Sequence, residues 1–243
     1  MRERGLSGDA LLVIDDLVVS YYKKEILRGT SLEVRNTEIV ALVGANGSGK
    51  STLLKAVAGT LRPERGRILF GGVDITHHEP HKLAQMGIGF LMQGGIIFPS
   101  LTVMEHLQVA AQIFGKIHLE ERLPIIWHTF PLLSRDKNMR AGLMSGGERQ
   151  MLALSMLLVQ KTRLWLLDEP SAGLAPEAVR STMDVIKQLN LEEKITVLLV
   201  EQNLGEGLRI ADRTYVLKKG LAFEEERIDN LLDEGKLENL LFG

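Results

Sequence analysis

The clearest signal in the pattern of apolar positions is a set of short runs with almost no polar side chain. Three such runs are Ile39–Val43, Leu164–Leu167 and Ile195–Val200. Strands that are apolar on both faces are typical of parallel sheets that are covered on both sides. The pattern therefore predicts an α/β fold with a mostly parallel sheet at its centre.

Shorter runs of β-type composition lie in the N-terminal third of the chain and near its C-terminal end. Leu11–Tyr22, Ser31–Val34 and Arg67–Phe70 are separated by polar turns. Tyr215–Leu217 and Leu221–Phe223 flank a Lys-Lys-Gly turn. Two short apolar runs around such a turn predict a β-hairpin.

A helical pattern extends from Thr102 to about Met139, and Pro124 and Pro131 divide this region. Apolar residues recur there every three or four positions, which is the period of an amphipathic helix. They are Val103, Leu107, Ala110, Ala111 and Phe114. A further apolar run, Met151–Val159, predicts a buried helix, and an amphipathic stretch at Ile228–Leu241 is expected to close the chain.

Composition narrows the possible classes of function. The 243 residues are 45% hydrophobic and 25% charged, with a net charge of −2, so bulk charge does not favour nucleic acid or an anionic membrane as partner. No apolar run reaches the roughly 18 residues that span a bilayer. The first ten residues have no apolar segment of a signal peptide and are expected to be a loose tail. The absence of cysteine excludes disulfides, and we expect a cytosolic protein.

The most specific motif is GANGSGKST at Gly44–Thr52, which matches the phosphate-binding pattern G-x-x-x-x-G-K-[ST]. It follows the Ile39–Val43 strand and begins a predicted helix, which is the context that the motif requires. Backbone N–H groups and the helix N-terminus favour an anion there. Lys50 is expected to reach the outer phosphates, and the Ser51 hydroxyl to hold Mg²⁺. The residues expected to bind the triphosphate are Gly44, Asn46, Gly47, Ser48, Gly49, Lys50, Ser51 and Thr52.

Two adjacent acids end the Leu164–Leu167 strand. In enzymes with this phosphate loop, an acid at the tip of such a strand faces the bound Mg²⁺, and Asp168 is predicted to do so. Glu169 follows it and is predicted to accept a proton from the attacking water. Two acids after a strand are otherwise a common solvated strand end, and it is the phosphate loop that favours the catalytic interpretation.

A second small-residue turn lies at Met144–Gln150, MSGGERQ. Ser145, Gly146 and Gly147 begin the predicted helix and form a second candidate anion site. Two chains packed with a two-fold axis would each present this turn to the triphosphate of the other. An ordinary helix cap is the alternative.

These motifs, in this order and over nearly the whole chain, resemble the ATP-binding subunits of ABC transporters. The resemblance implies ATP and Mg²⁺ as ligands and an ATP-hydrolysing activity. It implies that Gln93 contacts Mg²⁺ and the attacking water. It also implies that Tyr21, or Tyr22 if the register shifts by one, stacks on adenine. The fold it implies is a P-loop core with a mostly parallel sheet, an antiparallel β-subdomain and a helical subdomain.

The resemblance also implies a domain organisation and partners. We expect a flexible tail at 1–10 and one ABC domain at 11–243, with helices inserted at about 94–150. The expected partners are transmembrane permease subunits and a second ATPase, as a homodimer or a heterodimer, without nucleic acid. The chain would be cytoplasmic and peripheral on the inner face of the membrane. The segment after Gln93 resembles the permease-contacting surface of such subunits.

Two departures from the family pattern are informative. Glu201-Gln202-Asn203 stands where the family has a histidine, and Gly173-Leu174-Ala175-Pro176 where it has Gly-Leu-Asp-Pro. Both are similar to ATPase subunits of branched-chain amino-acid importers. Gln202 is expected to donate a hydrogen bond to the γ-phosphate without carrying charge. The alternative is a soluble ABC ATPase that acts as a clamp in assembly, as in iron–sulfur cluster assembly.

Overall fold

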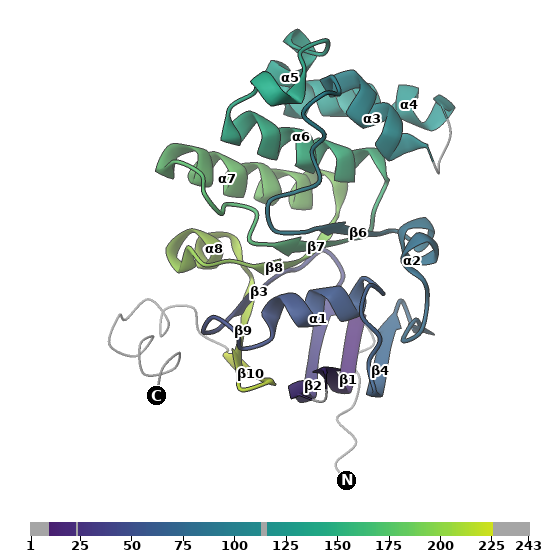
Figure 1. Ribbon diagram of the computed structural model, residues 1–243, viewed down its shortest axis with the longest axis vertical. Helices are drawn as coiled ribbons and strands as arrows, with labels where there is room; N and C mark the ends of the chain where they lie inside the picture. Colours follow the sequence, from purple (N-terminus) through teal and green to yellow (C-terminus); the bar gives the residue numbers. More distant parts are fainter. Residues whose placement is uncertain (1–9, 23, 113–115, 226–243) are drawn as a thin grey trace.

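The computed structural model describes residues 10–22, 24–112 and 116–225, and it contains two sheets (Figure 1). In the larger sheet the strand order is β10-β9-β3-β8-β7-β6. Its strands are β3 (Ile39–Val43), β6 (Ile88–Leu91), β7 (Leu164–Asp168), β8 (Thr196–Val200), β9 (Arg213–Lys218) and β10 (Leu221–Glu225). All neighbours pair in parallel except β10, which pairs antiparallel with β9. The predicted parallel sheet and the hairpin are confirmed.

The smaller sheet is antiparallel and comes from the N-terminal part of the chain. Its strands are β1 (Ala10–Tyr21), β2 (Lys24–Arg35), β4 (Arg65–Phe70) and β5 (Val73–Asp74). β2 begins well before the predicted Ser31–Val34 run, because its first half pairs with β1 although Lys24, Glu25 and Arg28 are exposed. The antiparallel β-subdomain is confirmed.

The helices lie in layers above and below the large sheet (Figure 1). They are α1 (Lys50–Val57), α2 (Pro80–Met86), α3 (Val103–Ala111), α4 (Lys116–Thr129), α5 (Pro131–Arg135), the 3₁₀ helix η1 (Ala141–Leu143), α6 (Gly146–Val159), α7 (Pro176–Glu193) and α8 (Leu204–Ile210). α7 and then α3 to α6 cover one face of the sheet, and α1 lies between the other face and the antiparallel sheet.

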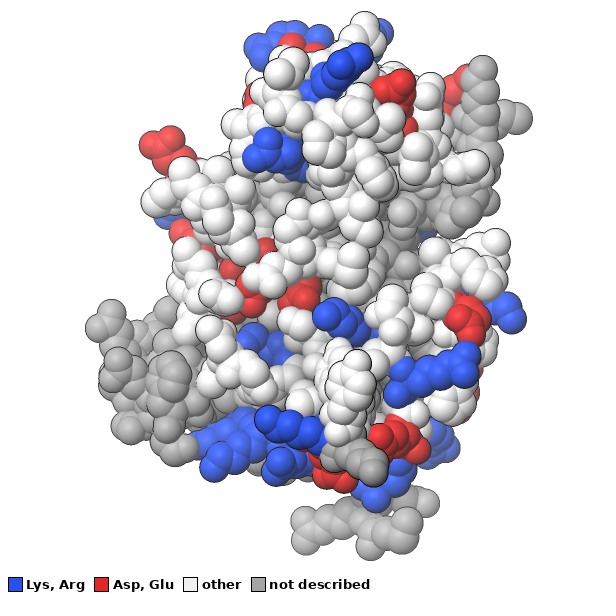
Figure 2. Space-filling model, viewed as in Figure 1, with Lys and Arg blue, Asp and Glu red and all other residues white. Residues whose placement is uncertain are grey.

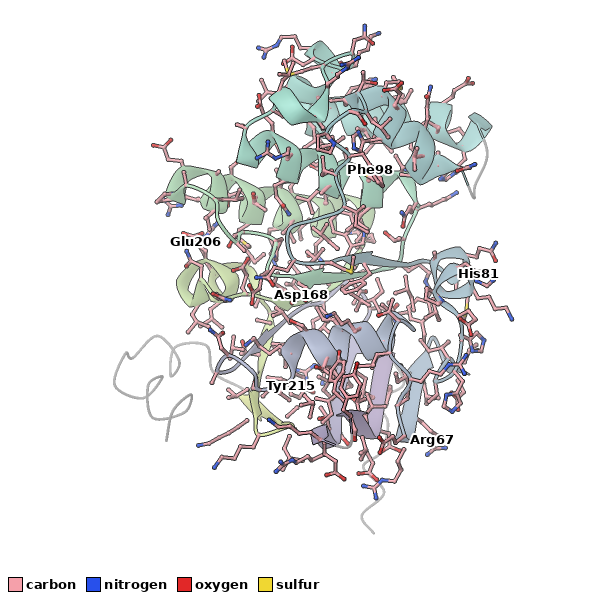
Figure 3. All side chains as sticks on the ribbon, viewed as in Figure 1. Arg67, His81, Phe98, Asp168, Glu206 and Tyr215 are labelled. Atoms are coloured by element: carbon pink, nitrogen blue, oxygen red, sulfur yellow. The ribbon has the colours of Figure 1, made fainter. Side chains whose placement is uncertain are left out.

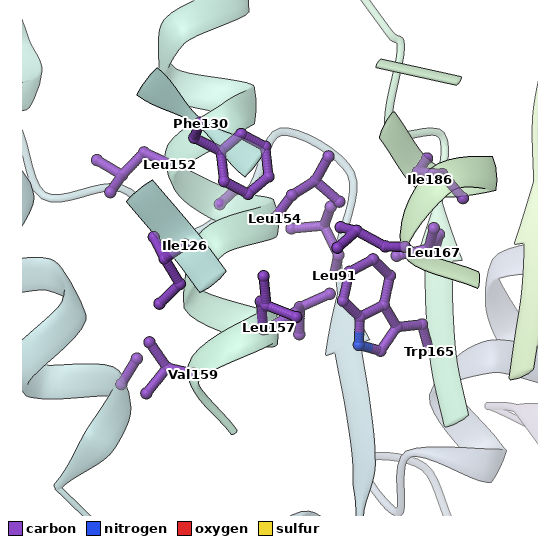
Figure 4. Close-up of a cluster of buried hydrophobic side chains, with 14 of the residues drawn as sticks. Leu91, Ile126, Phe130, Leu152, Leu154, Leu157, Val159, Trp165, Leu167 and Ile186 are labelled. Atoms are coloured by element: carbon purple, nitrogen blue, oxygen red, sulfur yellow. The ribbon is translucent and has the colours of Figure 1, made fainter. Parts of the chain in front are cut away.

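Alternate residues of β7 face the two hydrophobic cores. Trp165 and Leu167 pack with the α6 and α7 side chains (Figure 4), whereas Leu164 and Leu166 pack with α1 and the antiparallel sheet. All four are fully buried. This explains why the strand shows no polar alternation in the sequence.

The two prolines of the helical region have different effects. Pro131 occupies the first turn of α5, where its missing N–H costs nothing. Pro124 lies inside α4 instead of dividing it. Contacts on the neighbouring turn hold α4 in place, because Arg122 Nε donates to Leu158 O (3.1 Å) and Arg122 pairs with Glu193 (2.8 Å).

A turn after β9 joins the two sheets. The oxygen of Gly220 accepts hydrogen bonds from Arg28 N (2.9 Å) and Thr30 Oγ1 (2.6 Å), both in β2. Gly220 has a φ of +79°, and a Cβ atom there would lie 2.2 Å from Ile26 O. Only glycine fits this contact, so the turn fixes the antiparallel sheet against the edge of the large one.

The expected N-terminal tail falls largely on residues 1–9, and the expected C-terminal helix at Ile228–Leu241 lies wholly beyond residue 225. Both are outside the described residues. Ala10, assigned to the tail, begins β1. Within the described part of the chain, no helix has the length and apolar character needed to cross a membrane.

Candidate functional site

The phosphate loop lies where β3 ends and α1 begins. Gly49 is the N-cap of α1 with a φ of +111°, and a Cβ atom there would lie 2.8 Å from Leu27 Cδ2. The loop therefore needs glycine both for its conformation and for its contact with β2. Lys50 Nζ donates to Gly44 O (2.7 Å) and Ala45 O (3.1 Å), so the lysine folds back over the loop.

The electrostatic environment of Lys50 is set by burial and by two acids. Burial lowers the pKa of the ammonium group, while the charges of Glu169 and Asp168 act in the opposite direction. Ser48 Oγ is buried in the same loop and has no hydrogen-bond partner among the described residues. An orphaned hydroxyl beside a lysine fits an anion in the loop, as the motif predicts.

Asp168 and Ser51 meet across the site. Ser51 Oγ donates to Asp168 Oδ1 at 2.9 Å, and Figure 3 places Asp168 in the middle of the molecule. Burial raises the pKa of the Asp168 carboxyl, and the hydrogen bond from Ser51 opposes this shift. One hydroxyl and one carboxylate are hard oxygen donors that suit Mg²⁺, which takes few protein ligands and completes its shell with phosphates and water. Two of the three predicted metal ligands, Ser51 and Asp168, therefore lie together, whereas Gln93 donates to Glu169 Oε2 (2.6 Å) and its contact with Mg²⁺ stays a prediction.

Glu169 lies between two glutamines that are distant in sequence. Gln93 Nε2 donates to Glu169 Oε2 (2.6 Å), and Gln202 Nε2 donates to Glu169 Oε1 (2.8 Å). Glu169 is 8% exposed and has a φ of +51°, an uncommon conformation for a side-chain-bearing residue. Its N–H donates to Val200 O (2.8 Å), so the neighbouring strand holds this backbone in place. The structure thus joins all three residues predicted to be catalytic.

The Ser145 turn is a complete helix cap. Ser145 Oγ accepts from Glu148 N (3.3 Å), and Glu148 Oε2 accepts from Ser145 N (2.7 Å), which forms a capping box at the start of α6. Gly146 and Gly147 lie close to Leu174 and Ala178, since added Cβ atoms would be 3.4 Å from those side chains. Within the described residues, no hydrogen bond or ion pair joins this turn to the phosphate loop of the same chain.

Two loops, those after β6 and β7, meet the first turns of α6 around a cavity of about 200 Å³. It is lined by Gly94, Ile97, Gly146, Arg149, Gln150, Ala153, Ala172, Gly173 and Leu174. The segments that follow Gln93 and Glu169 therefore reach the start of α6.

In the same view as Figure 1, acidic side chains gather between the helical half and the rest of the molecule, and basic side chains gather along the lower edge of the molecule (Figure 2).

The two tyrosines considered for adenine stacking lie at the end of the β1 strand. Tyr21 is 38% exposed and Tyr22 is fully exposed, with a φ of +46°. Neither side chain belongs to the core, so both are available to a ligand, and the adenine role of Tyr21 stays a prediction.

One residue of the site was not singled out from the sequence. Glu201 follows β8 directly, is 4% exposed, and its carboxylate accepts three backbone N–H bonds, from Ser171, Gln202 and Asn203. An acid immediately after a buried strand is the same signal that identified Asp168 and Glu169, and it was present at this position too.

Comparisons with known proteins agree with this geometry. A family model described as "ABC transporter" matches residues 27–172. The chain is 38% identical over 227 residues to a probable branched-chain amino acid transport ATP-binding protein, LivF, of Archaeoglobus fulgidus, covering 93% of this chain and 96% of the relative. It is 38% identical over 229 residues to the high-affinity branched-chain amino acid transport ATP-binding protein BraG of Pseudomonas aeruginosa, covering 94% and 98%.

A solved structure extends the comparison to three dimensions. The ADP conformation of an ATP-binding cassette of an ABC transporter superposes with a TM-score of 0.85 at 26% identity, covering 95% of this chain and 98% of that one. The overall fold is therefore shared with that cassette over nearly the whole length of both chains.

Proposed function

The chain belongs to the ABC transporter family of ATP-binding proteins, and we propose that it is the ATP-hydrolysing subunit of an importer of branched-chain amino acids. The reaction is the conversion of ATP and water to ADP and phosphate, with Mg²⁺ as cofactor. The observation that supports our assignment of the site is the arrangement around Glu169. A buried carboxylate held by two amides stands beside the Ser51–Asp168 pair and the phosphate loop.

Each residue of the site has a role in this proposal. Lys50 and the loop N–H groups bind the outer phosphates, and Ser51 and Asp168 hold the cofactor. When bound, Mg²⁺ supplies positive charge that neutralises the phosphate oxygens. Glu169 accepts the proton of the attacking water, and Gln93 and Gln202 fix the direction of its carboxylate. The second N–H of the Gln202 amide stays available to the γ-phosphate, because only one is used by Glu169.

The substrate class comes from the relatives and not from the site. Both are named for branched-chain amino acid transport, and both match nearly end to end, so we extend this class to the present chain. Their names as transport proteins argue against the soluble assembly clamp.

We place the permease contact on the segment that follows Gln93. Ile96 and Phe98 are 56% and 46% exposed, and Leu143, which lies on the adjoining 3₁₀ helix, is 79% exposed. Gly142 N donates to Pro99 O (3.0 Å), so the two segments form one apolar surface. A permease bound there would keep the chain on the cytoplasmic face of the membrane. The permease would also lie within reach of the Gln93 loop, so that movement of that loop is transmitted to the permease.

The dimer is tested with the Glu169→Gln variant. It should bind ATP and hydrolyse it at least about 100-fold more slowly, because the proton acceptor is lost, and should form a dimer with ATP and Mg²⁺. Sizing by light scattering measures this, and Glu192→Gln, an exposed glutamate at the far end of α7, serves as control. A variant that stays monomeric at saturating ATP would exclude the homodimer and favour a heterodimer with a sister ATPase.

The transport role is tested by affinity purification from gently solubilised native membranes. We expect multi-span permease subunits to copurify with the chain. Recovery of soluble partners alone would contradict the transport assignment.

A further inference from the structure

Glu201 is a buried acid for which the proposed mechanism has no use. Its side chain is 4% exposed, and among the described residues no lysine or arginine forms an ion pair with it. A buried carboxylate is costly unless hydrogen bonds compensate its desolvation. The contacts of this carboxylate therefore indicate what it does.

The two oxygens of Glu201 are divided between two loops. Oε1 accepts from Ser171 N (2.9 Å), in the loop after β7, and Oε2 accepts from Gln202 N (3.0 Å) and Asn203 N (3.2 Å), in the loop after β8. Hydrogen bonds to a charged acceptor are stronger than those between neutral groups. One side chain thus binds the backbones of both loops.

Both loops lead directly to groups of the site. Gln202 donates to Glu169 Oε1 (2.8 Å). Ser171 lies two positions after Glu169, and Leu174 N donates to Ser171 O (3.1 Å), which brings the Leu174 side chain against Gly146. A continuous set of contacts therefore runs from Gln202 through Glu201 to the Ser145 turn.

The space for Glu201 depends on a glycine in α8. A Cβ atom on Gly207 would lie 3.0 Å from Glu201 Cβ and 3.5 Å from its Cγ. The helix that follows the loop thus packs against the glutamate, which limits its side chain to the observed direction.

We propose that Glu201 is a positioning residue that holds Gln202 and the 170–175 loop in one fixed arrangement, so that a displacement of Gln202 by the γ-phosphate is transmitted to the Ser145 turn. The Ser145 turn is expected from the sequence to face the nucleotide of a partner chain, so the effect of this coupling on a second ATP rests on the proposed function and its dimer. Glu201 itself touches neither nucleotide nor water in this scheme.

The test is steady-state hydrolysis of ATP by Glu201→Gln. The amide replaces one acceptor by an N–H₂ group that faces backbone N–H donors, so the two loops separate. We expect kcat to fall by roughly 10- to 100-fold, as for other small misplacements of catalytic groups, with the KM for ATP nearly unchanged because the phosphate loop is intact. Glu201→Asp, which keeps the carboxylate, should recover part of the loss.

Glu38→Gln is the matched control. Glu38 is also a buried glutamate (8% exposed) that accepts a backbone N–H bond, from Arg35 (2.8 Å). It differs in that it pairs with Arg213 (3.1 Å), and it precedes β3, at the opposite end of that strand from the phosphate loop. Its kcat should stay close to that of the wild type. Wild-type kcat in Glu201→Gln, an equal loss in Glu38→Gln, or a change confined to KM would each overturn the proposal.

Hydrogen exchange of the unmodified chain gives a second test that does not depend on the folding of a variant. On addition of ATP and Mg²⁺, the amides of Ser171, Gln202 and Asn203 should change protection together. A change at Gln202 and Asn203 without one at Ser171 would overturn the proposal. If the wild-type chain binds ATP but shows no hydrolysis, the proposed function fails separately, and the exchange experiment still decides the coupling.

Discussion

Two neutral amides hold the carboxylate of Glu169 at the centre of the site. Gln93 reaches it from the loop after β6 and Gln202 from the loop after β8. Neither amide titrates near neutral pH, so the orientation of the base does not depend on the protonation of its neighbours.

Removal of the Gln202 amide should change the orientation of the Glu169 carboxylate without changing the binding of ATP. In Gln202→Ala, Glu169 keeps only the bond from Gln93, and we expect kcat to fall by roughly 10- to 100-fold with ATP affinity little changed. Gln188→Ala, on α7 and away from the site, where the amide donates to Glu192 Oε1 (3.1 Å), is the control. Equal kcat values for the two variants would show that Gln202 does not orient the base.

Sequence reasoning at the residue scale was most specific where a motif fixes both residue type and spacing. Ser51, Asp168 and Glu169 were predicted because the phosphate loop gave meaning to two acids at a strand end. Glu201 stands at an equivalent strand end and was overlooked, because its partners are backbone N–H groups. Such groups have no signature in the side-chain sequence.

The helical layer depends on caps at the ends of its elements. Thr102 and Glu105 form a capping box at the start of α3, where Thr102 N and Thr102 Oγ1 donate to Glu105 Oε2 at 2.7 and 2.8 Å. His106, fully buried on the same turn, accepts Phe98 N–H at Nε2 (2.9 Å) and contacts Thr102 O through Nδ1 (2.8 Å). The start of α3 thus fixes the apolar surface proposed for the permease.

The capping box should make the stability of the chain depend on pH. The pKa of Glu105 is lowered, first by the bond from the Thr102 N–H and then by that from its hydroxyl. A carboxyl with a lowered pKa stabilises the folded chain above its unfolded pKa of about 4.3, and this contribution is lost as the pH falls through the folded value. The free energy of unfolding of Glu105→Gln should therefore lie below that of the wild type at pH 7, and the two should converge in acid.

Denaturant unfolding at a series of pH values measures this difference. Glu120→Gln, an exposed position on α4, should differ little from the wild type at any pH. A Glu105→Gln deficit that stays constant well below about pH 4.3, where the carboxyl is protonated in both the folded and the unfolded chain, would contradict the role of the ionised carboxylate.

Element type was predictable where the apolar pattern was clear, but boundaries were predictable only where both faces of an element are buried. The apolar strand β3 was predicted to the residue, because both its faces are buried. The start of β2 was missed, since Lys24 and Glu25 are exposed and pair only through their backbone. Pro124 was expected to divide the helical region, yet contacts with α6 and α7 outweigh its local preference.

At the scale of the molecule, the site joins the segments that follow β3, β6, β7 and β8 of the large sheet, so ligand binding should stabilise the whole chain. With ATP and Mg²⁺ at about 100 times the dissociation constant, the gain is about 2.7 kcal/mol. For this chain length it corresponds to roughly 5–10 °C in Tm. The Glu169→Gln variant is suited to this measurement because it does not consume the ligand.

Differential scanning fluorimetry with and without EDTA tests this expectation. Chelation should remove most of the shift, and Lys50→Ala should show little shift at the same ATP concentration. An unchanged shift in EDTA would contradict the assignment of Ser51 and Asp168 as metal ligands.

The order of strands in the large sheet could not be derived from the apolar pattern. Parallel pairing was predicted, but nothing in the runs of β3, β7 and β8 distinguishes one neighbour from another. The resemblance to a known family, carried by motifs and not by periodicity, supplied the architecture.

That order has a consequence for biosynthesis. β3, which leads into the phosphate loop, pairs with β8 on one side and β9 on the other, and both are made long after it. While the ribosome adds the intervening residues, this fully apolar strand has neither of its native neighbours. Nascent chains that end before about residue 200 therefore expose unpaired apolar strand edges, which can associate with other chains. The chain becomes able to bind nucleotide only when β8 and β9 have been synthesised, near the end of translation.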